Sequence, residues 1–399
     1  MSDVAKRLAE LRRSGLHRRL RLIEGPQGPR VLLDGADVLL LCSNNYLGLA
    51  DHPTVRTAAA EAAERYGAGS GASRLISGSM SVHRLLEHRL ATFKGSEAAL
   101  LFGSGYLANI GVVSTLAGRG EVVFSDELNH ASIIDGCRLS RAETFVYRHL
   151  DTEHLAWGLR EAGDRARLIV TDGVFSMDGD VAPLAELVEL GRRHGCLLAV
   201  DEAHGTGALG PGGRGSVAAA GLSDEVDVII GTLGKALGSY GAYVCASRQL
   251  VELLINLARP FIYSTAPPPP SVGAALAALG LLTERPGLVE QLRRNAATLR
   301  EALSARGLAT GSSRTQIVPV MVGDARRAMT LCERTLEAGV FAQAIRPPTV
   351  PQGSSRLRLT VMANHRGEDL RYAAAAIAAA AGDLGVSGLE SERSLRRAA

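Results

Sequence analysis

From about residue 97 to residue 247, short apolar runs alternate with stretches of helical period. The runs are AALLF, EVVFSD, TFVY, RLIVTD, CLLAVD, VDVIIG and AYVCAS. Between them, stretches such as PLAELVELGRRHG space leucine and valine along one helical stripe and stop at a glycine, Gly195. Because the runs are apolar throughout instead of alternating, they suit strands that are covered on both faces. This pattern predicts a doubly wound α/β domain around a mostly parallel sheet.

The chain has 399 residues, which is too long for one small core, so two or three packed units are expected. The alternation stops at RPFIYSTAPPPPS, where four consecutive prolines occupy positions 267–270. A long connecting helix and then smaller α+β material should follow. We therefore predict an N-terminal helical and extended segment (1–49), a large domain (50–285), a smaller C-terminal domain (286–386) and a solvated tail (387–399).

Composition excludes several classes of partner. The net charge is only +3, which gives no support to a nucleic-acid partner. No apolar run approaches the length of a membrane span. The first residues lack the apolar core of a signal peptide, but Val4, Leu8 and Leu11 recur at helical spacing and predict an amphipathic helix. The five cysteines form no CxxC pair and suit buried free thiols, so a cytoplasmic protein without a metal site is expected.

Polar residues follow four of the predicted strands. In open α/β sheets, ligands gather outside the carboxyl ends of the strands. An acid, a histidine, a hydroxyl and a lysine at successive strand ends would therefore converge on one site. These ends are Ser125–Asp126, Asp172–Ser176, Asp201–His204 and Thr232–Lys235.

Two nucleotide motifs in this region do not fit their context. HGTGALG contains G-x-G-x-x-G, but the PGGRGS that follows cannot open the helix that a dinucleotide site requires. DEAH at 201–204 resembles a helicase motif, yet the chain has no G-x-x-x-x-G-K-[ST] phosphate loop. The nearest candidate has Ile229 in place of the first glycine and Ala236 in place of the serine or threonine. The sequence therefore predicts neither a dinucleotide site nor a nucleotide-hydrolase site.

Pyridoxal phosphate is the cofactor that needs these groups together. It requires a lysine for its covalent bond and a carboxylate that keeps its ring nitrogen protonated. Lys235 lies among small residues in GTLGKALGS, and Asp201 closes CLLAV, where a buried carboxylate needs a cationic partner. The phosphate needs backbone N–H groups at a helix start. Gly103–Ser104–Gly105, with a helix opening near Tyr106, would supply them.

Two histidines complete this predicted site. His204 lies three residues after Asp201 and is placed to bond the phenolic oxygen of the ring. His130, in LNHAS, could lie flat on the face of the ring. A nearby cation lowers the pKa of a lysine, and the neutral amine is the form that reacts with an aldehyde. The predicted catalytic residues are Lys235, His130, Asp201 and His204.

With these residues assembled, the chain resembles the α-oxoamine synthases, a branch of the fold-type I pyridoxal-phosphate enzymes. The resemblance covers nearly the whole length. It implies a large central domain with a mostly parallel seven-stranded sheet, a smaller α+β C-terminal domain and a homodimer with shared active sites. The motifs that carry it are SNNYLGLADHP, GAGSGASRLISG, HASIIDGCRLSRA, DGVFSMDGD, VDEAHGTGALG, GTLGKALGSYGA and FIYST.

The resemblance also implies roles for further residues. For the cofactor, Gly105, Tyr106 and Thr232 hold the phosphate, Ser176 and His204 contact the ring and its substituents, and Ser264 or Thr265 reaches the phosphate of the neighbouring subunit. For the substrates, Arg358 anchors the carboxylate of the amino acid, and Arg18 meets the far carboxylate of the acyl chain. The other implied substrate contacts are Asn44, His130 and Thr349.

Within this family, AIRPPTVPQGSSRLRLTVMANH resembles the branch that serves biotin synthesis. That branch joins L-alanine to a pimeloyl thioester, carried on coenzyme A or acyl carrier protein, and releases carbon dioxide and the thiol. Three alternatives stay open. They are another family member that uses glycine or serine, such as 2-amino-3-ketobutyrate coenzyme A ligase, a pyridoxal-phosphate aminotransferase, and a non-catalytic protein that keeps the fold.

Overall fold

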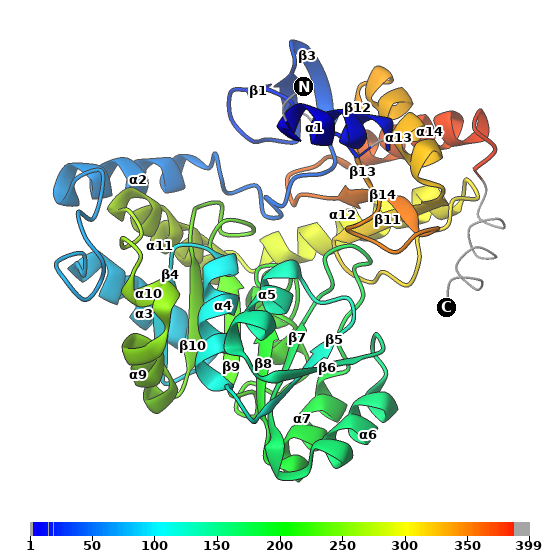
Figure 1. The fold of residues 1–399 in the computed structure, drawn as a ribbon. Helices are drawn as coiled ribbons and strands as arrows, with labels where there is room; N and C mark the ends of the chain where they lie inside the picture. The colour runs from blue at the N-terminus through cyan, green and yellow to red at the C-terminus, as the bar shows by residue number, and fades with distance from the viewer. Residues whose placement is uncertain (1–2, 15, 19, 387–399) are drawn as a thin grey trace.

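The structure is a computed structural model that describes residues 3–14, 16–18 and 20–386. The predicted tail at 387–399 lies outside the described residues. A large α/β body carries a second, smaller group of strands and helices at one end, where the N-terminal segment and the C-terminal part lie side by side (Figure 1).

The largest sheet has seven strands in the order β4-β10-β9-β8-β7-β5-β6. Strand β10 runs antiparallel to β4 and β9, and the other neighbours are parallel. The predicted mostly parallel seven-stranded sheet is therefore confirmed. Its strands are β4 (Ala98–Phe102), β5 (Val122–Asp126), β6 (Glu143–Tyr147), β7 (Ala166–Asp172), β8 (Leu197–Asp201), β9 (Val228–Thr232) and β10 (Ala242–Ala246).

Helices cover both faces of this sheet, which explains the continuous apolar runs. Leu168 and Val170 of β7 pack in the core under one set of helices, whereas Ile169 packs under the other. The first set is α4 (Gly105–Leu116), α5 (Ala131–Ser140), α9 (Arg248–Leu257) and α10 (Arg259–Ile262). The second set is α3 (Ser81–Lys94), α6 (Thr152–Ala162), α7 (Leu184–His194) and α11 (Pro269–Glu284). Further pieces are α2 (Pro53–Tyr66), which packs against α11, α8 (Ser216–Ala219), and the 3-10 turns η1 (Gly163–Arg165) and η2 (Pro211–Gly213).

The two ends of the chain share a sheet. Its order is β1-β2-β3-β12, and β12 runs parallel to β3 with Val340 opposite Leu39. A third sheet has the order β11-β14-β13. The elements are α1 (Asp3–Arg13), β1 (Ile23–Glu24), β2 (Arg30–Leu33), β3 (Ala36–Leu40), β11 (Ile317–Gly323), α13 (Ala325–Glu337), β12 (Val340–Phe341), β13 (Gln343–Ile345), β14 (Ser355–Thr360) and α14 (Gly367–Gly382).

The amphipathic helix predicted at the N-terminus is present as α1. None of its residues is buried, and Val4, Leu8 and Leu11 are exposed.

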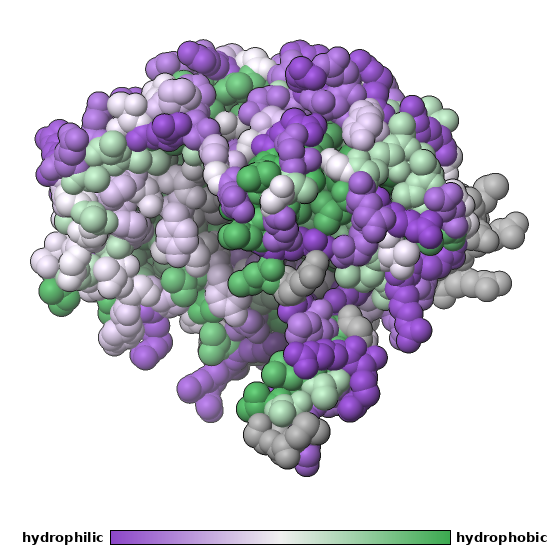
Figure 2. Space-filling model, turned by 90° about the horizontal axis from the view of Figure 1, so that it is seen from above, coloured by the Kyte–Doolittle hydropathy of each residue, from purple (hydrophilic) through white to green (hydrophobic). Residues whose placement is uncertain are grey.

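Seen from above, the molecule has hydrophobic side chains gathered near the middle of this face, bordered by hydrophilic ones (Figure 2). The predicted domain boundaries stay a prediction.

The single long helix expected after the prolines is wrong. The segment forms α11 and α12 (Gly287–Ser304), bent by 82° at the break between them. Pro286 stands at this break and cannot continue a helix, because it has no backbone N–H to donate. Among the described residues, no one helix has the length and apolar character of a membrane span; only this bent pair passes such a test, by length and composition.

Gly238 fixes the loop that carries Lys235, and we predict that Gly238→Ala destabilises the fold. Its φ is +59°, and an added Cβ would lie 2.4 Å from the backbone nitrogen of Ala50. We expect a loss of about 1–3 kcal/mol in the free energy of unfolding, measured by urea denaturation. The control is Gly280→Ala in α11, where a Cβ meets nothing within 4 Å and should be neutral or stabilising. Equal stability of the two variants would contradict this account of the loop.

Candidate active site

A cavity of about 170 Å³ lies at the carboxyl ends of β7, β8 and β9. The starts of α4 and α5 close its other side. The structure thus brings residues from three of the four predicted strand ends together with Gly105 of the predicted phosphate turn. The fourth end, Ser125–Asp126, does not line the cavity, and Asp126 instead contacts His149. The cavity is lined by Gly105, Tyr106, Asn109, His130, Ser132, Asp172, Asp201, Ala203, His204, Thr232 and Lys235.

The amine of Lys235 lies 2.8 Å from Nε2 of His204. Burial lowers the pKa of Lys235 to about 8, although the charges of Asp201 and Asp172 raise it. Burial also lowers the pKa of His204 well below its usual value, and the positive charge of Lys235 acts in the same direction. Near neutral pH His204 is therefore an uncharged imidazole, and Lys235 is a neutral amine in a much larger fraction than an ordinary lysine, although most of it is still protonated.

Asp201 is the buried carboxylate of the cavity. Its side chain accepts hydrogen bonds from Asn109 Nδ2 at 2.7 Å and from the backbone N–H of Ala203 at 2.8 Å. Among the described residues, no ion pair within 4.0 Å is formed by Asp201. A buried carboxylate held only by neutral donors is suited to pair with a cationic ring nitrogen.

His130 caps the first turn of α5, where its Nδ1 accepts from the backbone N–H of Ser132 at 3.2 Å. Its own backbone N–H donates to Asp172 at 2.8 Å. Burial and the neighbouring charge of Asp201 raise the pKa of Asp172 well above its usual value. Burial lowers the pKa of His130, so its ring is neutral near pH 7.

The N-terminus of α4 forms the far wall of the cavity. Ser104 caps it by accepting from Leu107 N at 3.2 Å, and the backbone at Gly105 has open space where a Cβ would be. A helix start with free N–H groups and no side chain in the way can approach a phosphate closely. Thr232 also lines the cavity, but its hydroxyl already donates to the carbonyl of Gly241 at 3.1 Å.

Two predicted substrate residues, Arg358 and Asn44, form a separate cluster with Ser176, which was predicted as a cofactor contact but does not line the cavity. The guanidinium of Arg358 donates to the carbonyl oxygen of Ser176, and both of its terminal nitrogens lie 3.2 Å from Asn44 Oδ1. Asn44 Oδ1 also accepts from the hydroxyl of Tyr46 at 3.0 Å. Tyr46 in turn lies 2.6 Å from Nδ1 of His204, which connects this cluster to the lysine.

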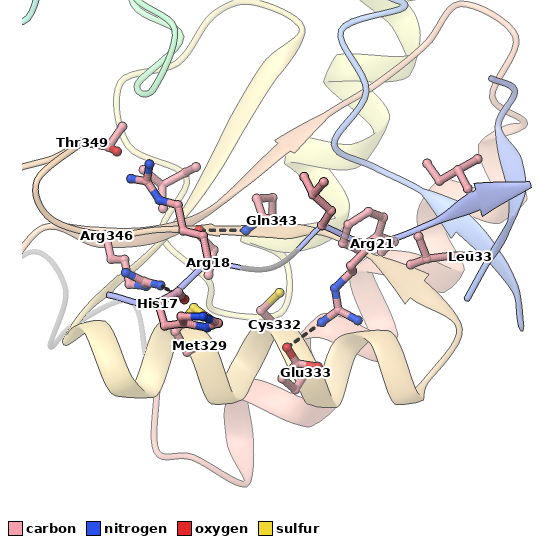
Figure 3. A pocket seen from close by; sticks show the side chains of 15 residues that line it. His17, Arg18, Arg21, Leu33, Met329, Cys332, Glu333, Gln343, Arg346 and Thr349 are labelled. Carbon is pink, nitrogen blue, oxygen red and sulfur yellow. Dashed lines mark hydrogen bonds and ion pairs between the residues drawn. The ribbon is translucent and has the colours of Figure 1, made fainter. Parts of the chain in front are cut away.

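Arg18 and Thr349 line a second cavity, of about 670 Å³, together with His17, Arg21 and Arg346 (Figure 3). Arg21 is neutralised there by Glu333 at 2.6 Å, whereas the described structure gives Arg18 no ion pair.

The predicted residues Ser264 and Thr265 line neither cavity. Thr265 instead pairs with Ser73 in an isolated bridge.

Sequence reasoning missed Asn109, Ser132 and Tyr46. Asn109 is 1% exposed and is a polar residue inside the apolar helix GYLANIGVVSTL, a signal that could have marked it. Its Nδ2 also donates to Ser132 Oγ at 2.8 Å. Tyr46 gave no such signal, because a tyrosine in an apolar segment is ordinary core.

The comparisons with known proteins agree with this geometry. The sequence model of the family "Aminotransferase class I and II" matches residues 36–377. An 8-amino-7-oxononanoate synthase of Geobacter sulfurreducens is 57% identical over 387 residues, which cover 96% of this chain and 99% of that protein. The chain belongs to this family, in the branch of the 8-amino-7-oxononanoate synthases.

Solved structures of the family have the same fold. A serine palmitoyltransferase from S. paucimobilis with a bound pyridoxal phosphate–myriocin aldimine is 34% identical, with a TM-score of 0.91 and coverage of 96% of this chain and 98% of that one. An 8-amino-7-oxononanoate synthase from Francisella tularensis is 29% identical, with a TM-score of 0.76 and coverage of 88% and 99%. The fold-type I architecture and pyridoxal phosphate as cofactor are thereby established for the family member described here.

The residues present fit this cofactor. The buried Asp201, the amine of Lys235 and the helix start at Gly105 face one cavity. Asn109 Oδ1 is buried without a partner in the described structure, so the cavity still offers an unused acceptor. The individual roles of the residues stay proposals.

The pKa of Lys235 predicts the pH dependence of cofactor uptake. Only the neutral amine attacks an aldehyde, so covalent uptake of pyridoxal phosphate by cofactor-free protein should rise with pH around a midpoint near 8. An ordinary lysine would have its midpoint near about 10.4. The rate of uptake is measured by absorbance, with free N-acetyl-lysine as the control for titration of the cofactor itself. A midpoint above pH 10 would show that burial does not act as described.

Proposed function

We propose that this enzyme condenses L-alanine with a pimeloyl thioester to give 8-amino-7-oxononanoate, carbon dioxide and the free thiol, a step of biotin synthesis. The observation that carries the chemistry is the cavity that unites a lysine of lowered pKa with a buried carboxylate. The relatives that are 50–57% identical carry the name of this activity and support the choice of substrates.

Bound pyridoxal phosphate withdraws electrons from the α-carbon of the amino acid. Lys235 would hold the cofactor through its amine, and the same amine would serve as the base for the α-proton of the amino acid. The neutral His204, 2.8 Å from the amine, can share a proton with it without adding charge. Asp201 would keep the ring nitrogen protonated, and His130, which lines the same cavity, would pack against the ring.

Arg358 orients the carboxylate of alanine. It is 7% exposed and lies beside Ser176 and Asn44, so a bound carboxylate would meet a guanidinium that is already fixed in place. A fork of fixed donors suits bidentate binding of a carboxylate. Orientation matters because the cofactor weakens only the bond that stands perpendicular to its ring.

The second cavity is the proposed place for the acyl chain. Pimeloyl is apolar along its length and ends in a carboxylate, and this cavity combines Ile345 and Phe341 with arginines. Glu333 already neutralises Arg21, and Arg346 donates to the backbone carbonyl of His17, so Arg18 is the proposed partner of the far carboxylate. Thr349 lines the same cavity and is proposed as a further contact.

The active protein is proposed to be a cytoplasmic homodimer. Tyr263, which precedes Ser264 in the chain, is 71% exposed, and Ile76, which donates its backbone N–H to the Thr265 partner Ser73, is 80% exposed. Such exposure is unusual for apolar side chains of this size. A second copy would cover them and would bring Ser264 or Thr265 to the neighbouring cofactor phosphate.

Product analysis tests the proposed reaction. Incubation with L-alanine and pimeloyl-coenzyme A should give the mass of 8-amino-7-oxononanoate, whereas glycine and acetyl-coenzyme A should give little product. Lys235→Ala should lower turnover by at least about a hundredfold and abolish the borohydride-reduced cofactor adduct. A product only from glycine would assign another member of the family. Conversion of the cofactor to its amine form without any thioester would indicate transamination.

The assignment of Arg18 has a matched control in Arg21. Arg18→Ala should raise KM for pimeloyl-coenzyme A by roughly tenfold or more, because a charge-assisted contact is lost. The turnover number should hold, since the contact is the same in the ground and transition states. Arg21→Ala should change KM much less. The assignment is wrong if steady-state kinetics show that Arg21→Ala raises KM for pimeloyl-coenzyme A more than Arg18→Ala does.

A further inference from the structure

The buried hydroxyl of Tyr46 lies between His204 on the cofactor side of the site and Asn44 on the substrate side. Its side chain is fully buried, at 0% exposure. The hydroxyl lies 2.6 Å from His204 Nδ1 and 3.0 Å from Asn44 Oδ1. Burial raises the pKa of Tyr46, so the phenol keeps its proton. The hydroxyl therefore makes these two hydrogen bonds, and it can donate its single proton in only one of them.

The direction of these hydrogen bonds can be worked out from the donors. Arg358 can only donate, and both of its terminal nitrogens face the same atom of Asn44, so that atom is the amide oxygen. An amide oxygen only accepts, so Tyr46 donates to it. The oxygen of Tyr46 is then left to accept from His204 Nδ1.

This direction fixes the tautomer of His204. A neutral imidazole carries one proton, and with that proton on Nδ1 its Nε2 is an acceptor. Nε2 faces the amine of Lys235 at 2.8 Å, and an amine is a donor. Gln316 donates to the backbone carbonyl of His204 at 2.8 Å, and its side chain also hydrogen-bonds the Tyr46 hydroxyl. Within the described structure, Tyr46 is the hydrogen-bond partner of Nδ1.

We propose that Tyr46 is a positioning residue that sets the tautomer of His204 and so presents an acceptor to the Lys235 amine. The chain of hydrogen bonds runs from Lys235 through His204, Tyr46 and Asn44 to Arg358. It links the group that binds the cofactor to the group that orients the carboxylate. The catalytic meaning of this link rests on the proposed function, whereas the tautomer itself does not.

Tyr46→Phe tests the proposal. Without the phenol oxygen, a proton on Nδ1 would be buried without an acceptor, so the proton should move to Nε2. Nε2–H cannot accept from a lysine ammonium, so the midpoint for cofactor uptake should shift downward by about one pH unit. The turnover number should fall by about tenfold while KM for alanine changes less than twofold, because Arg358 and Asn44 remain.

The tautomer is read directly by 15N NMR of the full chain before cofactor is added. Histidine is labelled, and the His204 signals are identified by their loss in His204→Gln. The native protein should show the Nδ1-protonated pattern and Tyr46→Phe the Nε2-protonated one. An unchanged pattern together with an unchanged midpoint would overturn the proposal, whatever product the enzyme makes.

Two further variants separate positioning from structure. Tyr243→Phe also removes a buried phenol oxygen, one that bonds Thr206 at 2.9 Å, and should leave the tautomer and the midpoint unchanged. Asn44→Ala removes the acceptor that orients the Tyr46 proton, which can then turn to Nδ1. It should therefore give the same tautomer change as Tyr46→Phe, even if that variant folds poorly. A native tautomer in Asn44→Ala would count against the proposal.

Discussion

The contact between the Lys235 amine and the neutral ring of His204 is the interaction on which the site depends. The ring nitrogen can accept a hydrogen bond from the lysine whether or not the lysine is protonated, and burial lowers the pKa of the lysine to about 8. Asp201 and Asp172 oppose that effect, because both carboxylates raise the pKa of the lysine. Burial and the two carboxylates thus shift the pKa of the lysine in opposite directions. The resulting pKa lies near the pH at which an amine can both attack an aldehyde and transfer a proton.

This balance follows from the order of strands in the large sheet. Because β8 lies between β7 and β9, the ends of all three meet at one edge. Asp172 and Asp201 are direct register partners across β7 and β8. Burial and the repulsion of the neighbouring Asp201 raise the pKa of Asp172, while Asn109 and Ala203 donate hydrogen bonds to Asp201. Parallel pairing therefore determines the electrostatics of the cavity as well as its shape.

The sequence predicted the part of the site that depends on period and strand ends. Continuous apolar runs indicate strands covered on both faces, and polar residues after them, such as Asp201 and Lys235, must meet at one edge. Asn109 was not predicted because it lies inside a helix, where the direction of its side chain depends on how α4 packs. The break between α11 and α12 was missed although Pro286 marks it, because the apolar pattern continues on both sides of it.

The substrate side of the site, where Asn44 meets Arg358, has a different origin. For this reason its residues could be predicted only from the family resemblance. Residues 41–46 run alongside the C-terminal strand β14: Thr360 donates its backbone N–H to Leu41 at 2.7 Å, and Ala363 donates to Tyr46 at 2.7 Å. These contacts join segments more than 300 residues apart and bring Asn44 against Arg358. No periodicity within either segment encodes such a pairing. The cofactor side is built by neighbouring strands of one sheet, whereas the carboxylate side exists only after the two ends of the chain have closed over it. A substitution in residues 41–46 can therefore alter the carboxylate site while leaving the large sheet intact.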